Sequence, residues 1–537
     1  MSAYKEPQKN KARELVINSA VKSLTKARKA STLTRKSYLR EVRDHLVSSG
    51  HSYDASVAKQ LTDATITRWE AFYDSVVQDR SPANLKVAYL SGPNPENDLR
   101  VLCKAGVLPE NIWAFESENT IYSEAVISAL SSEFPFIKII NGGLDTFLEA
   151  SPQKFDIIYL DFCGPLPSRN KKQKTLGALT RIFSRHALNS PGALITNFSL
   201  PNEEQDSEGR NLLAKLVACY LYPKSSLEDK DTGSGFAEGP IAEDLCPEEW
   251  LVKVESDLEF YYGQFITRLL IDHASLISTY NRFPKNNYLY KKFFSGKEAE
   301  LLAELRSKFF HFDERGDGGD VIIDASQYPT LWSMAALDKT LNARDANYPQ
   351  FIFNDENFSK FADQFLAQLD TATNKKALID NHLLLTYLLL EGNEQPHHWS
   401  AAIQKLSKSH RFSDFYQFCD LVLFHQVLET LFRQVAVPYH INVEKTERWV
   451  YQAKDTPMFM DMLLLDECRY LYDWMPTMDM FNNAVSDTER QLSYRFILDG
   501  VGKHRRWYNP EYFFGTAVVD QWTKNFEAKT LSSRKKI

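Results

Sequence analysis

The sequence predicts an α/β core, built as a parallel sheet covered by helices, within a chain that is otherwise mainly helical. Two observations predict this core. Short apolar segments recur between residues 85 and 200, each followed by a polar turn and a helical stretch. Apolar residues run almost continuously through these segments, as in strands that are buried on both faces. At 537 residues the chain is long enough for roughly two to four domains, so the core is one part of it.

Each predicted strand ends in polar or turn-forming residues. We expect the strands at residues 86–91, 111–115, 136–140, 155–160 and 193–196. We expect helices between them at residues 97–105, 117–131, 144–150 and 176–187. Strands that alternate with helices in this way are typical of a doubly wound parallel sheet, so we place one α/β core at residues 81–205.

The rest of the chain divides into three stretches by composition and periodicity. Residues 1–80 predict a basic helical extension, residues 206–350 a mostly helical extension, and residues 351–537 an α-rich C-terminal domain with some strands. In the last two stretches we expect helices at residues 212–221, 248–279, 296–310, 357–369, 376–390, 399–406 and 413–435, and strands at 439–443 and 448–451. The basic stretch at residues 533–536 predicts a disordered tail.

The composition argues against several classes of protein. The chain is 43% hydrophobic and 25% charged, as is typical of soluble globular proteins. Its six cysteines show no CxxC spacing, so we predict no metal site and a reducing compartment. The sequence shows no secretory signal, and no apolar stretch approaches the roughly 20 residues of a membrane helix. We therefore expect a cytoplasmic or nuclear protein that does not associate with membranes.

Basic charge is concentrated at the start of the chain. Residues 1–50 contain 12 Lys and Arg against 4 Asp and Glu, although the whole chain has a net charge of −7. Four basic side chains lie largely off the apolar stripe of a predicted helix, namely Arg35, Lys36, Arg40 and Arg43. Such a face is either simply solvated or binds the phosphates of a nucleic acid. Nucleic acid is therefore one predicted partner, and these four residues are its candidate contacts.

The candidate site residues follow the predicted strands. In an open parallel sheet, ligands bind beyond the carboxyl ends of the strands. The residues at these ends are Ser91, Gly92 and Asn94 after the first strand, Glu116 after the second, Asp145 after the third, and Asp161, Cys163 and Gly164 after the fourth. Acids near a helix start and glycines in a turn also have purely structural roles. Asp161 is the strongest candidate, because it ends a strongly apolar strand at the ligand edge.

This order of elements resembles that of the class I S-adenosylmethionine-dependent methyltransferases over residues 85–200. The resemblance implies a Rossmann-like methyltransferase core and S-adenosylmethionine as the cofactor. It also implies roles for the strand ends: Ser91, Gly92 and Asn94 in the loop close to the cofactor, Glu116 as acceptor for the ribose hydroxyls, Asp145 against the adenine, and Asp161 facing the methyl group and the acceptor. Glu116 lies 24 residues after Gly92, close to the roughly 20 expected in nucleotide-binding folds.

Residues 161–164 indicate which acceptor this methyl group would reach. Asp161 and Gly164 have the spacing of an Asp-Pro-aromatic-Gly motif, which resembles methyltransferases acting on guanine amines in transfer RNA, although the proline is absent. The carboxylate and a backbone carbonyl of residues 162–163 would accept hydrogen bonds from an exocyclic amine and aim its lone pair at the methyl carbon. Cys163 is either a nucleophile, as carbon-5 pyrimidine methylation requires, or a small packed side chain.

Three functions remain open on the sequence. The first is an S-adenosylmethionine-dependent methyltransferase acting on a base amine of a nucleic acid, with RNA preferred and Asp161, Cys163 and Gly164 as candidate catalytic residues. The second is a catalytically degenerate scaffold that binds a protein partner through its C-terminal helical region. Two features support this second function. The loop after the first strand has one glycine where the family usually has three, and Tyr89 stands roughly where the family has an acid. The third is a dinucleotide-dependent oxidoreductase, which the absence of GxGxxG disfavours.

Overall fold

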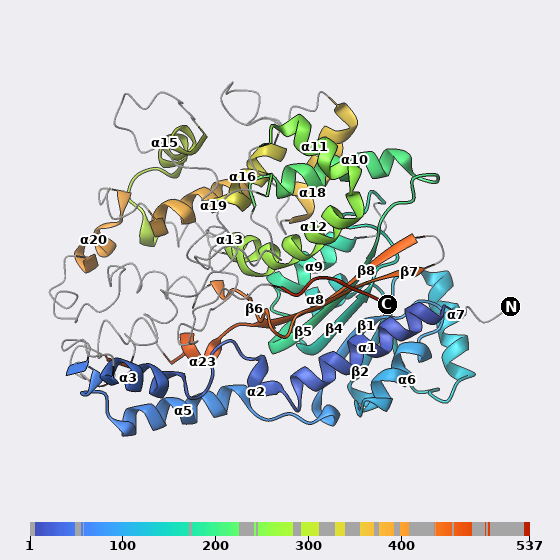
Figure 1. The fold of residues 1–537 in the computed structure, drawn as a ribbon, viewed down its shortest axis with the longest axis horizontal. Helices are drawn as coiled ribbons and strands as arrows, with labels where there is room; N and C mark the ends of the chain where they lie inside the picture. The colour runs from blue at the N-terminus through green and yellow to red at the C-terminus, as the bar shows by residue number, and fades with distance from the viewer. Residues whose placement is uncertain are drawn as a thin grey trace.

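The computed structural model describes most of the helices and strands of the chain. It covers residues 6–48, 55–170 except 57, 174–224, 241–282 except 243–244, 291–310, 328–338, 355–369, 375–390, 398–407, 434–474 except 435 and 454–455, 489, 492–493 and 531–537. Figure 1 shows one central sheet with helices on both faces. The helix predicted at residues 413–435 lies almost entirely outside the described residues.

The N-terminal region is helical, as predicted. It contains α1 (Pro7–Leu24), α2 (Arg28–Ser31), α3 (Tyr38–Ser48) and α5 (Asp63–Val77). Pro7 begins α1, where the fixed φ of proline suits the first helical position. One side of α1 is apolar and buried, because Ala12, Val16, Ala20 and Leu24 recur every four residues. This side packs α1 against the sheet and α6.

The core alternates strands and helices. In chain order it contains β1 (Val87–Leu90), α6 (Glu96–Lys104), β2 (Ile112–Glu116), α7 (Asn119–Leu130), β3 (Lys138–Asn141), α8 (Leu144–Ala150), β4 (Phe155–Asp161), α9 (Thr175–Ser184) and β5 (Leu188–Ser199). The five strands are parallel in the order β3-β2-β1-β4-β5, which confirms the predicted Rossmann-like sheet. The strand order reverses between β1 and β4, and ligands bind at such a reversal.

Both faces of the sheet are buried, which explains the continuous apolar character of its strands. Alternate residues of a strand point to opposite faces. Ile157 and Tyr159 of β4 belong to the core that α1 and α6 cover. Ile158 and Leu160, one residue further along, belong to the core formed with α8, α9, α10 (Ser207–Leu221) and α12 (Leu258–Asp272). The sheet is therefore the middle of three layers.

The C-terminal strands join the same sheet. They are β6 (His440–Ile441), β7 (Glu447–Ala453), β8 (Thr456–Asp466) and β9 (Lys535–Lys536). β8 pairs antiparallel with β5 and with β7, so one layer combines residues of the stretches 81–205 and 351–537. These strands thus extend the core and form no sheet of their own.

The prediction of a disordered end at residues 533–536 is wrong. Lys535 and Lys536 form β9 beside β7, and the guanidinium of Arg534 lies between β8 and α12. It forms an ion pair with the fully buried Asp461 and donates a hydrogen bond of 3.1 Å to the Thr267 hydroxyl. A buried carboxylate requires such a partner, and the local sequence around Arg534 gives no sign of it.

The remaining described helices cover the α9 side of the sheet. Besides α10 and α12 they are α11 (Pro247–Ser256), α13 (Ser278–Arg282), α15 (Glu298–Phe310), α16 (Pro329–Leu337), α18 (Glu356–Leu369), α19 (Lys375–Leu390) and α20 (Ala401–Ser407). The short helix α23 (Arg469–Tyr472) packs instead against α5. The single helix predicted at residues 248–279 is interrupted by Asp257, whose side chain caps α12 through the Phe260 amide. Among the described helices, none combines the length and apolar character that crossing a bilayer demands.

Candidate functional site

A cavity of about 680 Å³ opens at the carboxyl edge of the parallel strands, where the strand order reverses. This volume is in the range of small-molecule and cofactor sites. Every candidate cofactor-binding or catalytic residue from the sequence lines it: Ser91, Gly92, Asn94, Glu116, Asp145, Asp161, Cys163 and Gly164. The structure therefore brings these strand ends together around one space.

The loop after β1 forms one wall of the cavity and is held in place by hydrogen bonds. The hydroxyl of Tyr89, which is fully buried, donates a hydrogen bond of 2.7 Å to the Pro95 carbonyl. Ser91 donates its amide to the Phe115 carbonyl of β2 at 3.0 Å. Gly92 has a φ of +58°, and a Cβ there would meet no described atom within 4 Å. Glycine thus permits this backbone conformation and leaves the adjoining space open.

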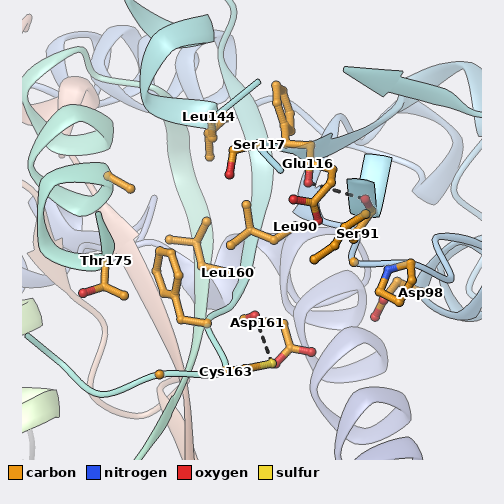
Figure 2. Close-up of a pocket in the computed structure, with 18 of the residues that line it drawn as sticks. Leu90, Ser91, Asp98, Glu116, Ser117, Leu144, Leu160, Asp161, Cys163 and Thr175 are labelled. Carbon is orange, nitrogen blue, oxygen red and sulfur yellow. Dashed lines mark hydrogen bonds between the residues drawn. The ribbon is translucent and has the colours of Figure 1, made fainter. Parts of the chain in front are cut away.

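The ends of β2 and β3 form a second wall. Glu116 accepts the Glu118 amide on its carboxylate and the Gly142 amide on its backbone carbonyl, both at 2.8 Å. Gly143 precedes α8, and a Cβ there would lie 2.2 Å from a carboxylate oxygen of Asp145. Glycine at 143 therefore lets Asp145 take its place in the cavity wall. In Figure 2 Glu116 lies at one end of the cavity, near Ser117 and Leu144.

Asp161 lies at the other end of the view in Figure 2, beside Cys163. One carboxylate oxygen forms an ion pair of 2.8 Å with the ammonium of Lys9, and the other accepts the Asn197 amide at 2.7 Å. The same Asn197 nitrogen lies 2.8 Å from the Tyr451 hydroxyl of β7. Burial would raise the pKa of Asp161, but Lys9 and Asn197 outweigh it and hold the pKa below its usual value. Asp161 is therefore an ionised carboxylate with partners on both oxygens.

One face of α1 completes the cavity, a contribution that the sequence analysis missed. Lys9, Asn10 and Arg13 line the space, and Arg13 forms a buried ion pair of 2.5 Å with Asp98 of α6. Burial would lower the pKa of Arg13, but Asp98 holds it above its usual value. One signal was available, because Arg13 lies three residues before Val16 on the apolar side of the helix. A charge within an apolar stripe predicts a buried partner.

The loop that contains Cys163 and Gly164 is fastened to the end of β5. Ser199 donates its hydroxyl to the Cys163 carbonyl at 3.2 Å and its amide to the Gly164 carbonyl at 3.1 Å. Loss of water and the neighbouring Asp161 raise the pKa of the Cys163 thiol. A nucleophilic cysteine requires the opposite shift. The raised pKa thus disfavours Cys163 as a nucleophile, and the hydrogen bond from Ser199 gives the Cys163 carbonyl a fixed position.

The four candidate nucleic-acid contacts lie away from the cavity. Figure 1 shows α3 and α5 at one end of the molecule, and α6 and α7 at the other. Each of the four forms an ion pair within the chain, in the pairs Arg35–Glu41, Lys36–Asp74, Arg40–Glu70 and Arg43–Asp63. Three of these four carboxylates belong to α5, so basic side chains on α3 and just before it are matched by an acidic face of α5.

Comparison with known proteins gives similarity to solved structures alone. No protein-family model and no curated protein matches the chain. Among solved structures, the chain is similar to the Methanococcus jannaschii fibrillarin pre-rRNA processing protein, with 14% identity and a TM-score of 0.17 over 24% of this chain and 53% of that one. It is also similar to TrmN from Thermus thermophilus, with 11% identity and a TM-score of 0.18 over 27% and 40% of the two chains. The chain thus spans about half the length, or less, of these structures.

Proposed function

We propose that this protein is an S-adenosylmethionine-dependent methyltransferase that acts on an amine of a nucleic acid base, with RNA as the preferred substrate. The observation that supports this most is the single cavity into which four parallel strands direct Gly92, Glu116, Asp145 and Asp161. The proposal combines this geometry with the resemblance of residues 85–200 to the class I family.

The residues of the cavity fit the proposed cofactor. Gly92 and Gly142 both line the space, and a Cβ on either would meet no described atom within 4 Å, as expected where a ligand approaches the backbone. Glu116 would accept hydrogen bonds from the ribose hydroxyls, and Asp145 would contact the adenine. S-adenosylmethionine would supply an electrophilic methyl group on a sulfonium.

Asp161 is the residue best placed to act on the acceptor. Its ionised carboxylate accepts N–H hydrogen bonds, which would turn the lone pair of an exocyclic amine toward the methyl group. After transfer the amine nitrogen has one proton too many, and the carboxylate or water takes it. The Cys163 carbonyl, held by Ser199, is a second acceptor at the same edge. The Asp161–Gly164 spacing underlies the preference for RNA.

One observation favours the alternative, a scaffold that has the fold without the activity. Both oxygens of Asp161 already have partners within the chain, Lys9 and Asn197. An acceptor amine must therefore compete with an ion pair. In this alternative the cavity binds no cofactor, and a protein partner binds the helical C-terminal region.

Calorimetric titration of S-adenosylmethionine and S-adenosylhomocysteine into wild type and Glu116→Ala separates the two. Micromolar binding that is lost in the variant supports the methyltransferase. Transfer of a tritiated methyl group to RNA, DNA or protein then identifies the substrate class. Absence of binding at millimolar cofactor would reject the methyltransferase and leave the scaffold.

A further inference from the structure

The start of α1 carries a second feature of the cavity. Glu6, Lys9, Asn10 and Arg13 all line the space. Lys9 and Asn10 are neighbours, and Glu6 and Arg13 lie three or four residues from both, which places all four on one side of the helix. Lys9 is the one that touches Asp161, at 2.8 Å. The ammonium of Lys9 thus occupies the position on Asp161 that a hydrogen-bonding acceptor amine requires.

The first turn of α1 is attached more weakly than the rest of the helix. The Glu6 side chain makes no capping hydrogen bond, and no acidic residue lies in the first turn. Such a turn lacks two usual sources of N-terminal stability. Pro7, Gln8 and Asn10 are exposed, whereas the buried stripe begins at Ala12. The described attachments of this turn are polar: Lys9 to Asp161, Gln8 to the Gln452 amide at 2.9 Å, and Asn10 to Arg13 at 2.7 Å.

We propose that residues 6–10 are a gate on the acceptor side of the cavity, and that the acceptor amine enters by displacing Lys9 from Asp161. The gate ends before Arg13, because the buried ion pair between Arg13 and Asp98 holds the following part of α1 in place. This inference rests on the proposed function for the identity of the acceptor. The opening of the turn itself does not depend on it.

Lys9 in this role is a positioning residue. With the gate closed and no substrate bound, the ammonium of Lys9 compensates the negative charge of Asp161. Without Lys9 this buried carboxylate would have no positively charged partner. With the gate open, an amine hydrogen bonds to the same oxygen.

Amide hydrogen exchange without any acceptor tests the gate first. The amides of residues 10 and 11, the first that bond within the turn, should exchange faster than those of residues 14–24 in wild type, and Asp161→Asn should accelerate them by about five-fold, as expected for the loss of one ion pair. Residues 14–24 should not change. Equal acceleration along all of α1, or none at residues 10 and 11, would overturn the gate.

Methyl transfer to total RNA tests the displacement. Lys9→Met should lower the KM for RNA by about five-fold, because the competing ion pair is gone. A role of Lys9 in folding alone would not lower KM. Lys11→Met, on the exposed side of the same turn, is the matched control and should match wild type. Loss of transfer in Lys9→Met would show that the reaction needs Lys9 in place, and would contradict displacement. If sinefungin, a stable cofactor analogue, does not bind in calorimetry, the proposed function fails while the exchange result still decides the gate.

Discussion

Two helices near the N-terminus, α1 and α3, carry basic side chains in different environments. On α3, Arg40 is paired with carboxylates at the surface, and its side chain is 36% exposed. On α1, Arg13 is 9% exposed and paired with a carboxylate that is 5% exposed. The sequence analysis assigned a function to the charges of α3, whereas the structure places the charges of α1 in the cavity. Charge alone did not distinguish them, because the difference lies in what each helix packs against.

Similar ion pairs contribute differently to the free energy of unfolding in these two environments. Exposed pairs are screened by water and salt, so each contributes little to stability. In a buried pair, loss of one partner leaves an uncompensated charge, which costs much more. We therefore expect substitutions in the cavity to have larger effects than substitutions on α3, and the four predictions below run from the largest effect to the smallest.

The largest effect is expected at Asp161. Asp161→Ala removes the carboxylate that accepts a hydrogen bond from the amine and takes its proton after transfer. The rate of methyl transfer to RNA should therefore fall by roughly 100- to 1000-fold. Tritiated methyl transfer measures it. Cys163→Ser is the control in the same loop and should retain activity, because the raised pKa of the thiol argues against a nucleophile. Inactivity of Cys163→Ser would reinstate the covalent mechanism.

The second prediction compares the two arginines directly. Arg13→Met should lower the free energy of unfolding by about 3 kcal/mol, since Asp98 is left buried without its partner. Arg40→Met should lower it by less than about 1 kcal/mol. Urea unfolding of both variants provides the values. Equal losses would mean that burial does not separate the two helices energetically.

The third prediction concerns the cofactor end of the cavity. Glu116→Ala should weaken S-adenosylhomocysteine binding by at least about 10-fold, the loss expected for a hydrogen bond to a charged group. Glu118→Ala changes the neighbouring acid, which lies outside the cavity lining, and should bind as wild type does. If calorimetry finds the same affinity for all three proteins, Glu116 does not hold the ribose.

The smallest effect is expected on α3. Replacing Arg40 and Arg43 together by Gln should leave the affinity for RNA within about two-fold, because their charges are already matched by Glu70 and Asp63. Filter binding at low salt measures this affinity. A loss of ten-fold or more would show that phosphates displace these carboxylates, and would restore α3 as a nucleic-acid contact.

Much of the fold was predictable because its signals are local. A continuous apolar run such as residues 157–160 is typical of a strand buried on both faces, and the polar residue that follows it is then expected at the sheet edge. The edge of β4 then predicted Asp161, and the edge of β2 predicted Glu116. The structure places both in one cavity.

Contacts between distant segments were not predictable. β8 pairs with β5 across about half the chain, and Arg534 reaches Asp461 from a stretch that looked disordered. The partner of a strand or a charge depends on which surfaces the fold brings together, and one sequence contains no record of that. Alternation and burial therefore determined the sheet and its ligand edge from sequence alone. Only the tertiary structure decided that Lys9 and Arg13 complete the site, because ion pairing depends on distance in space and not along the chain.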